Sequence, residues 1–125
     1  MNNAELLKSG RNRLLDLHKS LVDRERSNYE SFNGPVTSGQ FLNLLIEAPD
    51  FVWLRKFSTL IVDIDEMFAQ KDGFDNKAVD VHLSKMREIV KLMGDDEDFV
   101  TRYKTAIDED QGVAAIQSDL SQLLA

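Results

Sequence analysis

Apolar residues recur along the chain at the three- and four-residue spacing of helices, and no segment alternates every second residue as a half-buried strand would. The clearest stripes are Trp53, Phe57, Leu60, Ile61, Ile64 and Phe68; Val79, Leu83, Met86, Val90 and Met93; and Phe99, Tyr103, Ile107, Val113, Ile116, Leu120 and Leu123. Such stripes, joined by short turns, predict an all-α fold in one domain over residues 1–125. We expect an antiparallel bundle of about four main helices, with an extra short helix after the first and a kinked C-terminal helix.

Capping residues and helix breakers indicate where these helices begin and end. Asn2 with Glu5, and Thr37 with Gln40, have the spacing of capping boxes. Gly34-Pro35 and Pro49 each interrupt a helical pattern. The expected helices cover about 3–32, 41–47, 51–70, 77–93 and 97–124, and the last of them is broken near 110–112.

The charge of the chain is negative and unevenly distributed. Lysine and arginine number 15 against 22 acidic residues, a net charge of −7. Residues 1–60 hold 8 bases and 7 acids, whereas residues 61–125 hold 7 bases and 15 acids. An acidic half repels phosphate backbones, so we expect no nucleic acid as partner and favour a basic protein surface. The arginines and lysines between Arg11 and Arg26 are interrupted by acids and indicate a solvated helix face.

The apolar runs are too short for a membrane span, which needs roughly 20 apolar residues, and the N-terminus lacks the long uncharged run of a signal peptide. Cysteine is absent, which excludes disulfides and thiolate metal sites. We therefore expect a cytoplasmic protein that does not insert into membranes.

The chain matches none of the common catalytic or cofactor-binding patterns. The residues three before His18 and His82 are Leu15 and Val79, so the Glu-x-x-His pairs of di-iron bundles are missing. The chain also lacks the phosphate-binding glycine loops, HExxH and GxSxG. Residues 108–119 and 72–80 only loosely resemble calcium loops, and capped turns explain them better. The sequence predicts no catalytic residue, no cofactor and no metal.

The most unusual feature is a row of polar residues on the first helix. Leu7, Leu14 and Leu21 recur every seven residues, and beside them run Arg11, His18, Glu25 and Phe32. On a helix the two rows lie within about 60° of each other, so we expect the polar row to share the inner face of the leucines. Seven residues separate His18 from Glu25 by roughly 10 Å, which rules out a direct bond on a straight helix.

Each of these two residues therefore needs a partner from elsewhere. The candidate partners are Ser58, Asp65 and His82 from other helices, the arginines Arg11, Arg55 and Arg87 as counter-charges for Glu25, and the hydroxyl of Tyr29. In one interpretation His18, Glu25, Tyr29, Arg55, Ser58, Asp65 and His82 form a buried polar network that fixes helix register. In the other they line a polar cleft that binds a small molecule or a metal.

Three strings, HKSLVDRERSNYE at 18–30, GPV at 34–36 and WLRKFSTLIVDIDE at 53–66, together resemble a family of small, uncharacterised bacterial helical proteins. The resemblance covers about residues 12–124. It implies that the strings matter as a group, through His18, Asp23, Glu25, Arg26, Tyr29, Trp53, Arg55, Ser58, Asp65 and Glu66. It implies no activity, cofactor or partner.

Two functions from different classes remain, and a third, an acidic mimic of nucleic acid, rests on charge alone. The first is a non-enzymatic cytoplasmic bundle that acts through protein–protein contacts, with the acidic C-terminal half facing a basic partner. The alternative is a small-molecule- or metal-binding bundle, enzyme or not, with a polar inter-helix cleft around His18 and Glu25. The oligomeric state and the biological process do not follow from the sequence.

Overall fold

The computed structural model describes all 125 residues, and every element in it is helical. The elements, in chain order, are α1 (Asn3–Asn33), α2 (Ser38–Glu47), a 3-10 helix η1 (Pro49–Leu54), α3 (Arg55–Phe68), α4 (Asn76–Val90), α5 (Glu97–Glu109) and α6 (Gln111–Leu123). This confirms the all-α bundle with an extra short helix after the first.

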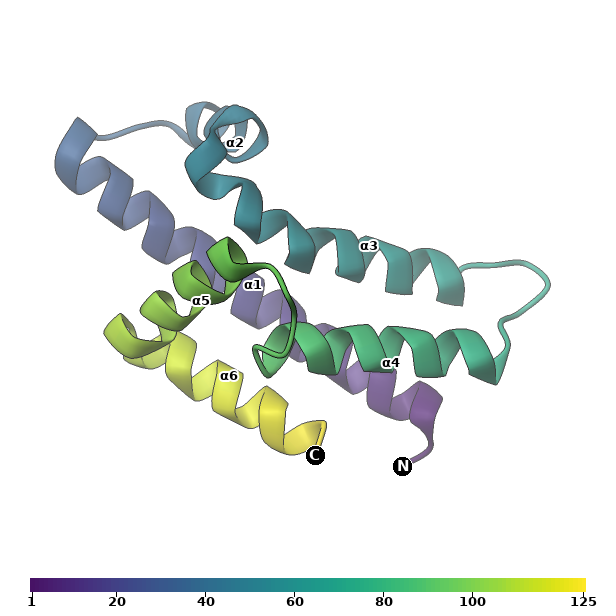
Figure 1. Cartoon of the computed structure of the whole chain (residues 1–125). Coiled ribbons are helices and arrows are strands. Elements are labelled where there is room, and N and C mark those ends of the chain that lie inside the picture. The colour runs from purple at the N-terminus through teal and green to yellow at the C-terminus, as the bar shows by residue number, and fades with distance from the viewer.

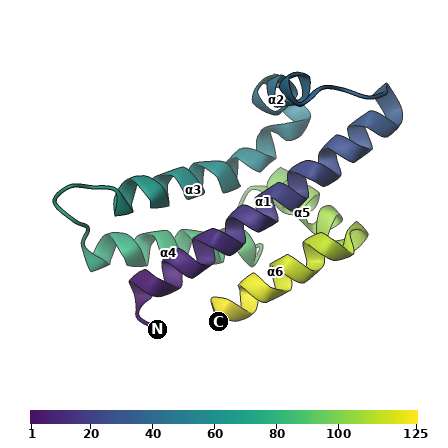
Figure 2. The same cartoon turned by 180° about the vertical axis from the view of Figure 1, so that it is seen from behind.

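The long helix α1 is the spine of the molecule, and α3, α4 and α6 pack along it (Figures 1 and 2). It begins where Asn2 accepts a hydrogen bond from the N–H of Glu5, and it ends at Gly34, whose φ of 84° suits glycine. Its buried residues are Leu7, Gly10, Leu14, Leu17 and Leu21. At Gly10 the helix lies so close to α4 that a Cβ atom would stand 2.7 Å from the sulfur of Met86.

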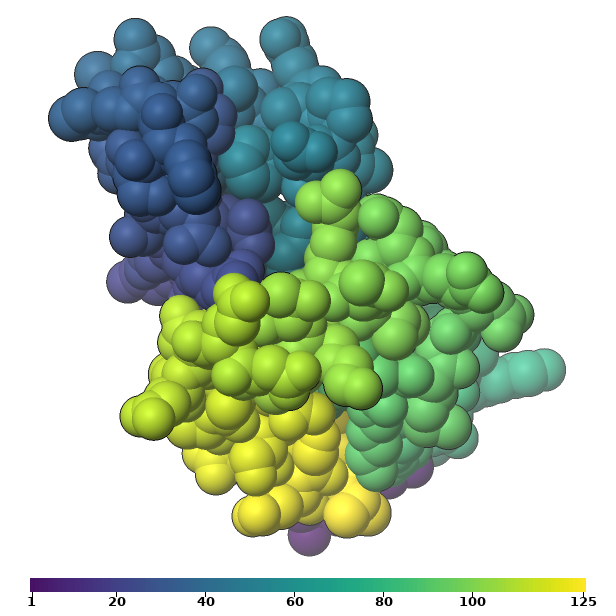
Figure 3. All heavy atoms as spheres, turned by 60° about the vertical axis from the view of Figure 1, so that its left-hand side comes forward, coloured from purple at the N-terminus to yellow at the C-terminus, as the bar shows by residue number.

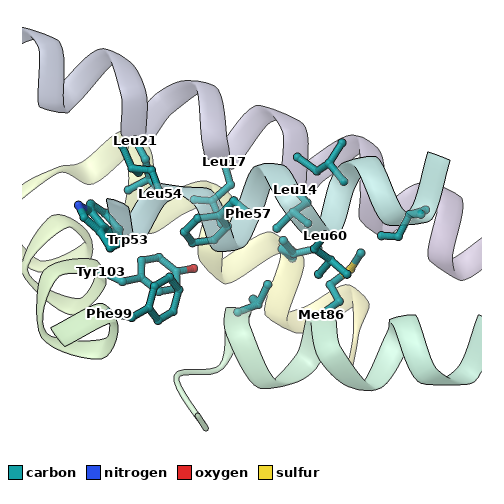
Figure 4. Packing of buried hydrophobic residues seen from close by; sticks show 14 of the residues in the cluster. Leu14, Leu17, Leu21, Trp53, Leu54, Phe57, Leu60, Met86, Phe99 and Tyr103 are labelled. Atoms are coloured by element: carbon teal, nitrogen blue, oxygen red, sulfur yellow. The ribbon is translucent and has the colours of Figure 1, made fainter. Parts of the chain in front are cut away.

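One hydrophobic core joins the helices, and its centre is aromatic (Figure 4). The ring of Phe57 lies 5.3 Å from that of Tyr103 and 5.5 Å from that of Phe99, while Trp53 packs against both Phe57 and Phe99. The hydroxyl of Tyr103 is buried among these rings without a hydrogen-bond partner, and burial raises the pKa of Tyr103.

The expected helix boundaries hold at most positions, with two local differences. The helix expected from residue 51 begins with the 3-10 helix η1, in which Pro49 occupies the first position. Helix α4 ends at Val90, and Leu92 follows it with a φ of 60°.

The break expected near 110–112 in the C-terminal helix is confirmed, but it is more than a kink. Asp110 is extended, with φ −126° and ψ 110°, and it separates α5 from α6. The two helices pack against each other, so the chain folds back at this point (Figure 1). The Asp110 carboxylate accepts hydrogen bonds from the N–H groups of Gly112 and Val113, which begins α6.

Helix α2 packs against η1, and both lie with the C-terminal end of α1 in the blue lobe above the yellow α6 in Figure 3. A full capping box between Thr37 and Gln40 starts it, as expected. Only Phe41 of this helix is fully buried, where its ring meets those of Tyr29 and Phe51. None of the helices in the molecule combines the length and the apolar character needed to cross a membrane.

Candidate functional site

The polar row of α1 lies at the edge of the buried face and not inside it. Arg11, His18 and Glu25 are all partly exposed, and Phe32 is 89% exposed. The buried stripe extends from Leu7, Leu14 and Leu21 toward Gly10 and Leu17, on the other side of the leucines. The expectation that the row shares the inner face holds only in part: the three polar side chains are half-buried beside the leucines, whereas α4 and α6 pack on the side of Gly10 and Leu17.

Asp65 pairs with Arg11 and with neither His18 nor Glu25. Arg11 donates from Nε and Nη2 to the two carboxylate oxygens of Asp65 at 2.9 and 2.8 Å. This bidentate geometry is typical of arginine and fixes α3 against α1. The pair lies near the surface, where such a contact contributes less than about 1 kcal/mol.

Glu25 takes its partner from its own helix. Arg24 donates from Nη1 to Glu25 and from Nη2 to Glu109 of α5, both at 2.7 Å. The side chain of Arg24 is only 11% exposed and that of Glu25 only 17%. Burial raises the pKa of Glu25, and the positive charges of Arg24 and Arg102 oppose that rise.

The sequence interpretation missed Arg24, which was assigned to a solvated face. The missed signal is its spacing: residues 10, 17 and 24 are seven apart, and Gly10 and Leu17 are both buried. Arg11, Arg55 and Arg87, the expected counter-charges of Glu25, make other contacts or face solvent. Arg87 donates to the carbonyl oxygen of Leu124, and Arg55 is exposed.

The other expected site residues are dispersed. Burial lowers the pKa of His18, and the ring makes no hydrogen bond to Glu25. Tyr29 packs its ring against Phe41 and Phe51, and Ser58 donates to the carbonyl oxygen of Arg55 at 3.3 Å. His82, on α4, has a buried Nδ1 atom without a partner. No three histidine, aspartate or glutamate side chains come together in a way that could hold a metal ion.

Two of the three larger clefts of the surface lie on the outer side of α3 and α4. The first, here called the aromatic cleft, has a volume of about 540 Å³. Its lining comprises Val52, Trp53, Arg55, Lys56, Thr59, Leu60, Asp63, Lys85, Glu88, Ile89, Gly94, Asp96, Asp98 and Phe99. The second, here called the acidic cleft, has a volume of about 590 Å³, and its lining comprises Asp63, Glu66, Met67, Gln70, Asp72, Gly73, Phe74, Asp75, Ala78 and His82.

The two clefts are the two ends of one groove. Asp63 lines both of them, and the α3 residues Lys56, Thr59, Asp63 and Glu66 of the lining follow one helix face at spacings of three and four, and Gln70 continues the row beyond the end of α3. The facing row on α4 follows the same rule, with Ala78, His82, Lys85 and Ile89. Because α1 packs along the other side of this helix pair and lines neither cleft, the α3–α4 groove opens outward.

The ends of the groove differ in charge. The acidic cleft is lined by four carboxylates, Asp63, Glu66, Asp72 and Asp75, and by no lysine or arginine. The aromatic cleft is nearly balanced, with three basic and four acidic side chains. No lone residue of the sequence indicated this groove, because it depends on how two helices are rotated against each other.

No known family model, curated protein or solved structure matches the chain. The resemblance to small bacterial helical proteins, which rests on the three strings, therefore stays a prediction.

Proposed function

We propose that this protein is a non-enzymatic, cytoplasmic binding module that holds a basic segment of a partner protein in the α3–α4 groove. The observation that carries the proposal is the acidic cleft, where four carboxylates surround a concave surface without a neutralising lysine or arginine. Such a surface attracts cationic side chains and repels anionic ones. The proposal includes neither nucleic acid nor membrane lipid as partner, since both present phosphates.

The groove also has a shape that suits a polypeptide. It follows α3 over about 14 residues, which corresponds to roughly 20 Å at 1.5 Å per residue. A helix or an extended segment can lie between two antiparallel helices in this way. The alternative site around His18 and Glu25 has less support, because neither residue lines any of the four main clefts.

The test uses a fluorescently labelled peptide of about 15 residues that carries four lysine or arginine residues, and a matched peptide with glutamine in their place. We expect the basic peptide to bind and the glutamine peptide not to bind, with an affinity that falls as salt rises. The protein variant is Asp63→Asn/Glu66→Gln/Asp72→Asn, since none of these three carboxylates makes a hydrogen bond in the fold. Its affinity should fall about tenfold, which corresponds to roughly 0.5 kcal/mol for each lost charge.

The matched control is Asp16→Asn/Asp23→Asn/Asp108→Asn, which removes the same charge from exposed positions outside the groove. Its affinity should change less than about twofold, because exposed charges more than a Debye length away are largely screened. Equal losses in both variants would show that only net charge matters and would contradict a site in the groove. The absence of any binding by the basic peptide, or turnover in a broad substrate screen, would contradict the proposed function.

A further inference from the structure

The aromatic cleft offers a different chemistry from the acidic cleft in the same groove. Its floor is formed by Trp53, Leu60 and Phe99, each no more than 4% exposed, and Val52 stands at its edge with 46% exposure. Figure 4 shows Trp53 and Phe99 side by side at one end of the core, with Leu60 further along α3. A concave surface of about 540 Å³ with such a floor is typical of sites that take an apolar group.

The charges around this cleft already neutralise one another. The ammonium of Lys56 lies 5.3 Å from the centre of the Phe99 ring and 3.5 Å from the carboxylate of Asp96. The N–H of Phe99 and the charge of Lys56 together hold the pKa of Asp96 below its usual range. Asp98 in turn pairs with Arg102 at 3.1 Å. An occupant of the aromatic cleft therefore meets nearly balanced charges, in contrast to the four carboxylates of the acidic cleft.

The side chain of Lys56 can give way to an occupant. It is 43% exposed, and its partner Asp96 is 48% exposed, so the ion pair is a surface contact of low energy. When Lys56 swings outward, its ammonium regains water and uncovers the Phe99 ring. The cleft thus opens further without disturbing the buried core.

The distance between the two clefts fixes the spacing that a partner must have. Lys56 and Glu66 are ten residues apart on α3, which places the two ends of the groove roughly 15 Å from each other. A helical partner covers this distance with about ten residues, and an extended one with four or five.

We infer that the partner segment is a helix with an apolar anchor residue, which enters the aromatic cleft between Val52, Trp53 and Phe99, at about 15 Å from the basic residues that bind the acidic cleft. This inference rests on the proposed function and adds the direction and the pattern of the bound segment. Its apolar end lies toward η1, and its basic end lies toward the turn between α3 and α4.

The experiment compares three peptides without tryptophan that share the same four basic residues. The first has only alanine and glutamine elsewhere, the second has one leucine ten residues from the basic cluster, and the third has the leucine three residues from it. We expect the second peptide to bind about tenfold more tightly than the other two, the gain that burial of one leucine provides. Trp53 is the only tryptophan of the chain, so its emission should shift with the second peptide alone.

Two valine variants of the protein test whether the leucine of the second peptide binds in the aromatic cleft. Val52→Gln should remove the tenfold gain of the second peptide and leave the binding of the first unchanged. Val62→Gln is the matched control, because Val62 is 51% exposed on α3 but lines neither cleft, and it should keep the gain. If the first peptide binds but the leucine adds nothing, or if Val62→Gln removes the gain as well, the inference is overturned while the proposed function stands. If no basic peptide binds, the result contradicts both the inference and the proposed function.

Discussion

Arg24 connects two carboxylates from different helices, Glu25 of α1 and Glu109 of α5. Its side chain is only 11% exposed, so its positive charge lies largely out of water between α1 and α5. Removal of one member of a buried pair leaves the other charge without compensation, which costs more than the pair itself contributes. Arg24 is therefore the charged side chain of α1 on which stability depends most.

We expect Arg24→Ala to lower the free energy of unfolding by about 2 kcal/mol, less than for a fully buried pair because Glu109 is 63% exposed. Urea denaturation measures this change. Lys19→Ala is the control, since Lys19 is an exposed cation on the same helix. A similar loss in both variants would show that the position of Arg24 has no special importance.

His18 makes the free energy of unfolding depend on pH, and the direction of this dependence follows from its burial. Burial lowers the pKa of His18 below its ordinary value of 6.5, so the unfolded chain binds a proton more readily than the folded one. Stability from this group is present above pH 6.5 and is lost as the pH falls through the folded pKa. The loss should amount to a few tenths of a kcal/mol, because the ring is only partly covered and water screens its charge.

The measurement is urea denaturation at several pH values between 7.5 and 5, for the natural chain and for His18→Gln. The stability of the natural chain relative to the variant should fall by a few tenths of a kcal/mol between pH 7.5 and pH 5. The raised pKa of Glu25 acts in the opposite direction, with stability falling as the pH rises above about 4.5, but it is common to both proteins and cancels in the comparison. If the free energy of unfolding depends on pH in the same way in both proteins, the pKa of His18 is not changed by folding.

The residue scale also shows where sequence reasoning fails. The spacing of seven correctly placed His18, Glu25 and Arg11 in one row, but it could not give the rotation of α1 about its own axis. Arg11 lies 40° from the leucine row and Gly10 lies 60° on its other side, at 100° per residue. Helix α4 packs against the face of α1 that carries Gly10, because a glycine lets it approach closely. This rotation of α1 also decides which side chains contact Arg11, His18 and Glu25.

At the scale of elements, the sequence was a better guide. Helix starts depend on short-range hydrogen bonds between side chain and backbone, and these are visible in the sequence as Asn2, Thr37 and Asp75. The fold-back at Asp110 was expected only as a kink. The direction of the chain after that residue depends on contacts of α6 with α1, which no local pattern encodes.

Asp110 is the residue at which this element boundary can be tested. We expect Asp110→Ala to lower the free energy of unfolding by about 1 kcal/mol, because two N–H groups at the start of α6 lose their acceptor. Urea denaturation again provides the value. Asp108→Ala removes the same charge from an exposed position two residues earlier and should change stability by no more than about 0.5 kcal/mol. Equal effects would attribute the loss to charge and not to capping.

At the scale of the whole molecule, two helix pairs share the spine α1, and the outer groove follows the pair α3–α4. The pair α3–α4 carries the acidic cleft and, together with η1 and the start of α5, the aromatic cleft, whereas α6 packs against α1 (Figures 1 and 4). The acidic balance of residues 61–125 was evident in the sequence. The gathering of acidic side chains at one end of a groove was not evident in the sequence, because many of the acids in this half serve as helix caps or pair with arginine.

The unpartnered hydroxyl of Tyr103 couples the stability of the entire bundle to alkaline solution. The phenol of an unfolded chain ionises near pH 10, whereas the buried one keeps its proton to higher pH, so each pH unit above 10 favours the unfolded chain by up to about 1.4 kcal/mol. Tyr103→Phe should weaken this alkaline sensitivity and leave the neutral-pH stability equal or higher by up to about 1 kcal/mol. Thermal unfolding followed at pH 7 and pH 11 tests both parts, and a variant as base-sensitive as the natural chain would contradict them. The aromatic core that holds the helices together thus also sets the alkaline boundary beyond which they come apart.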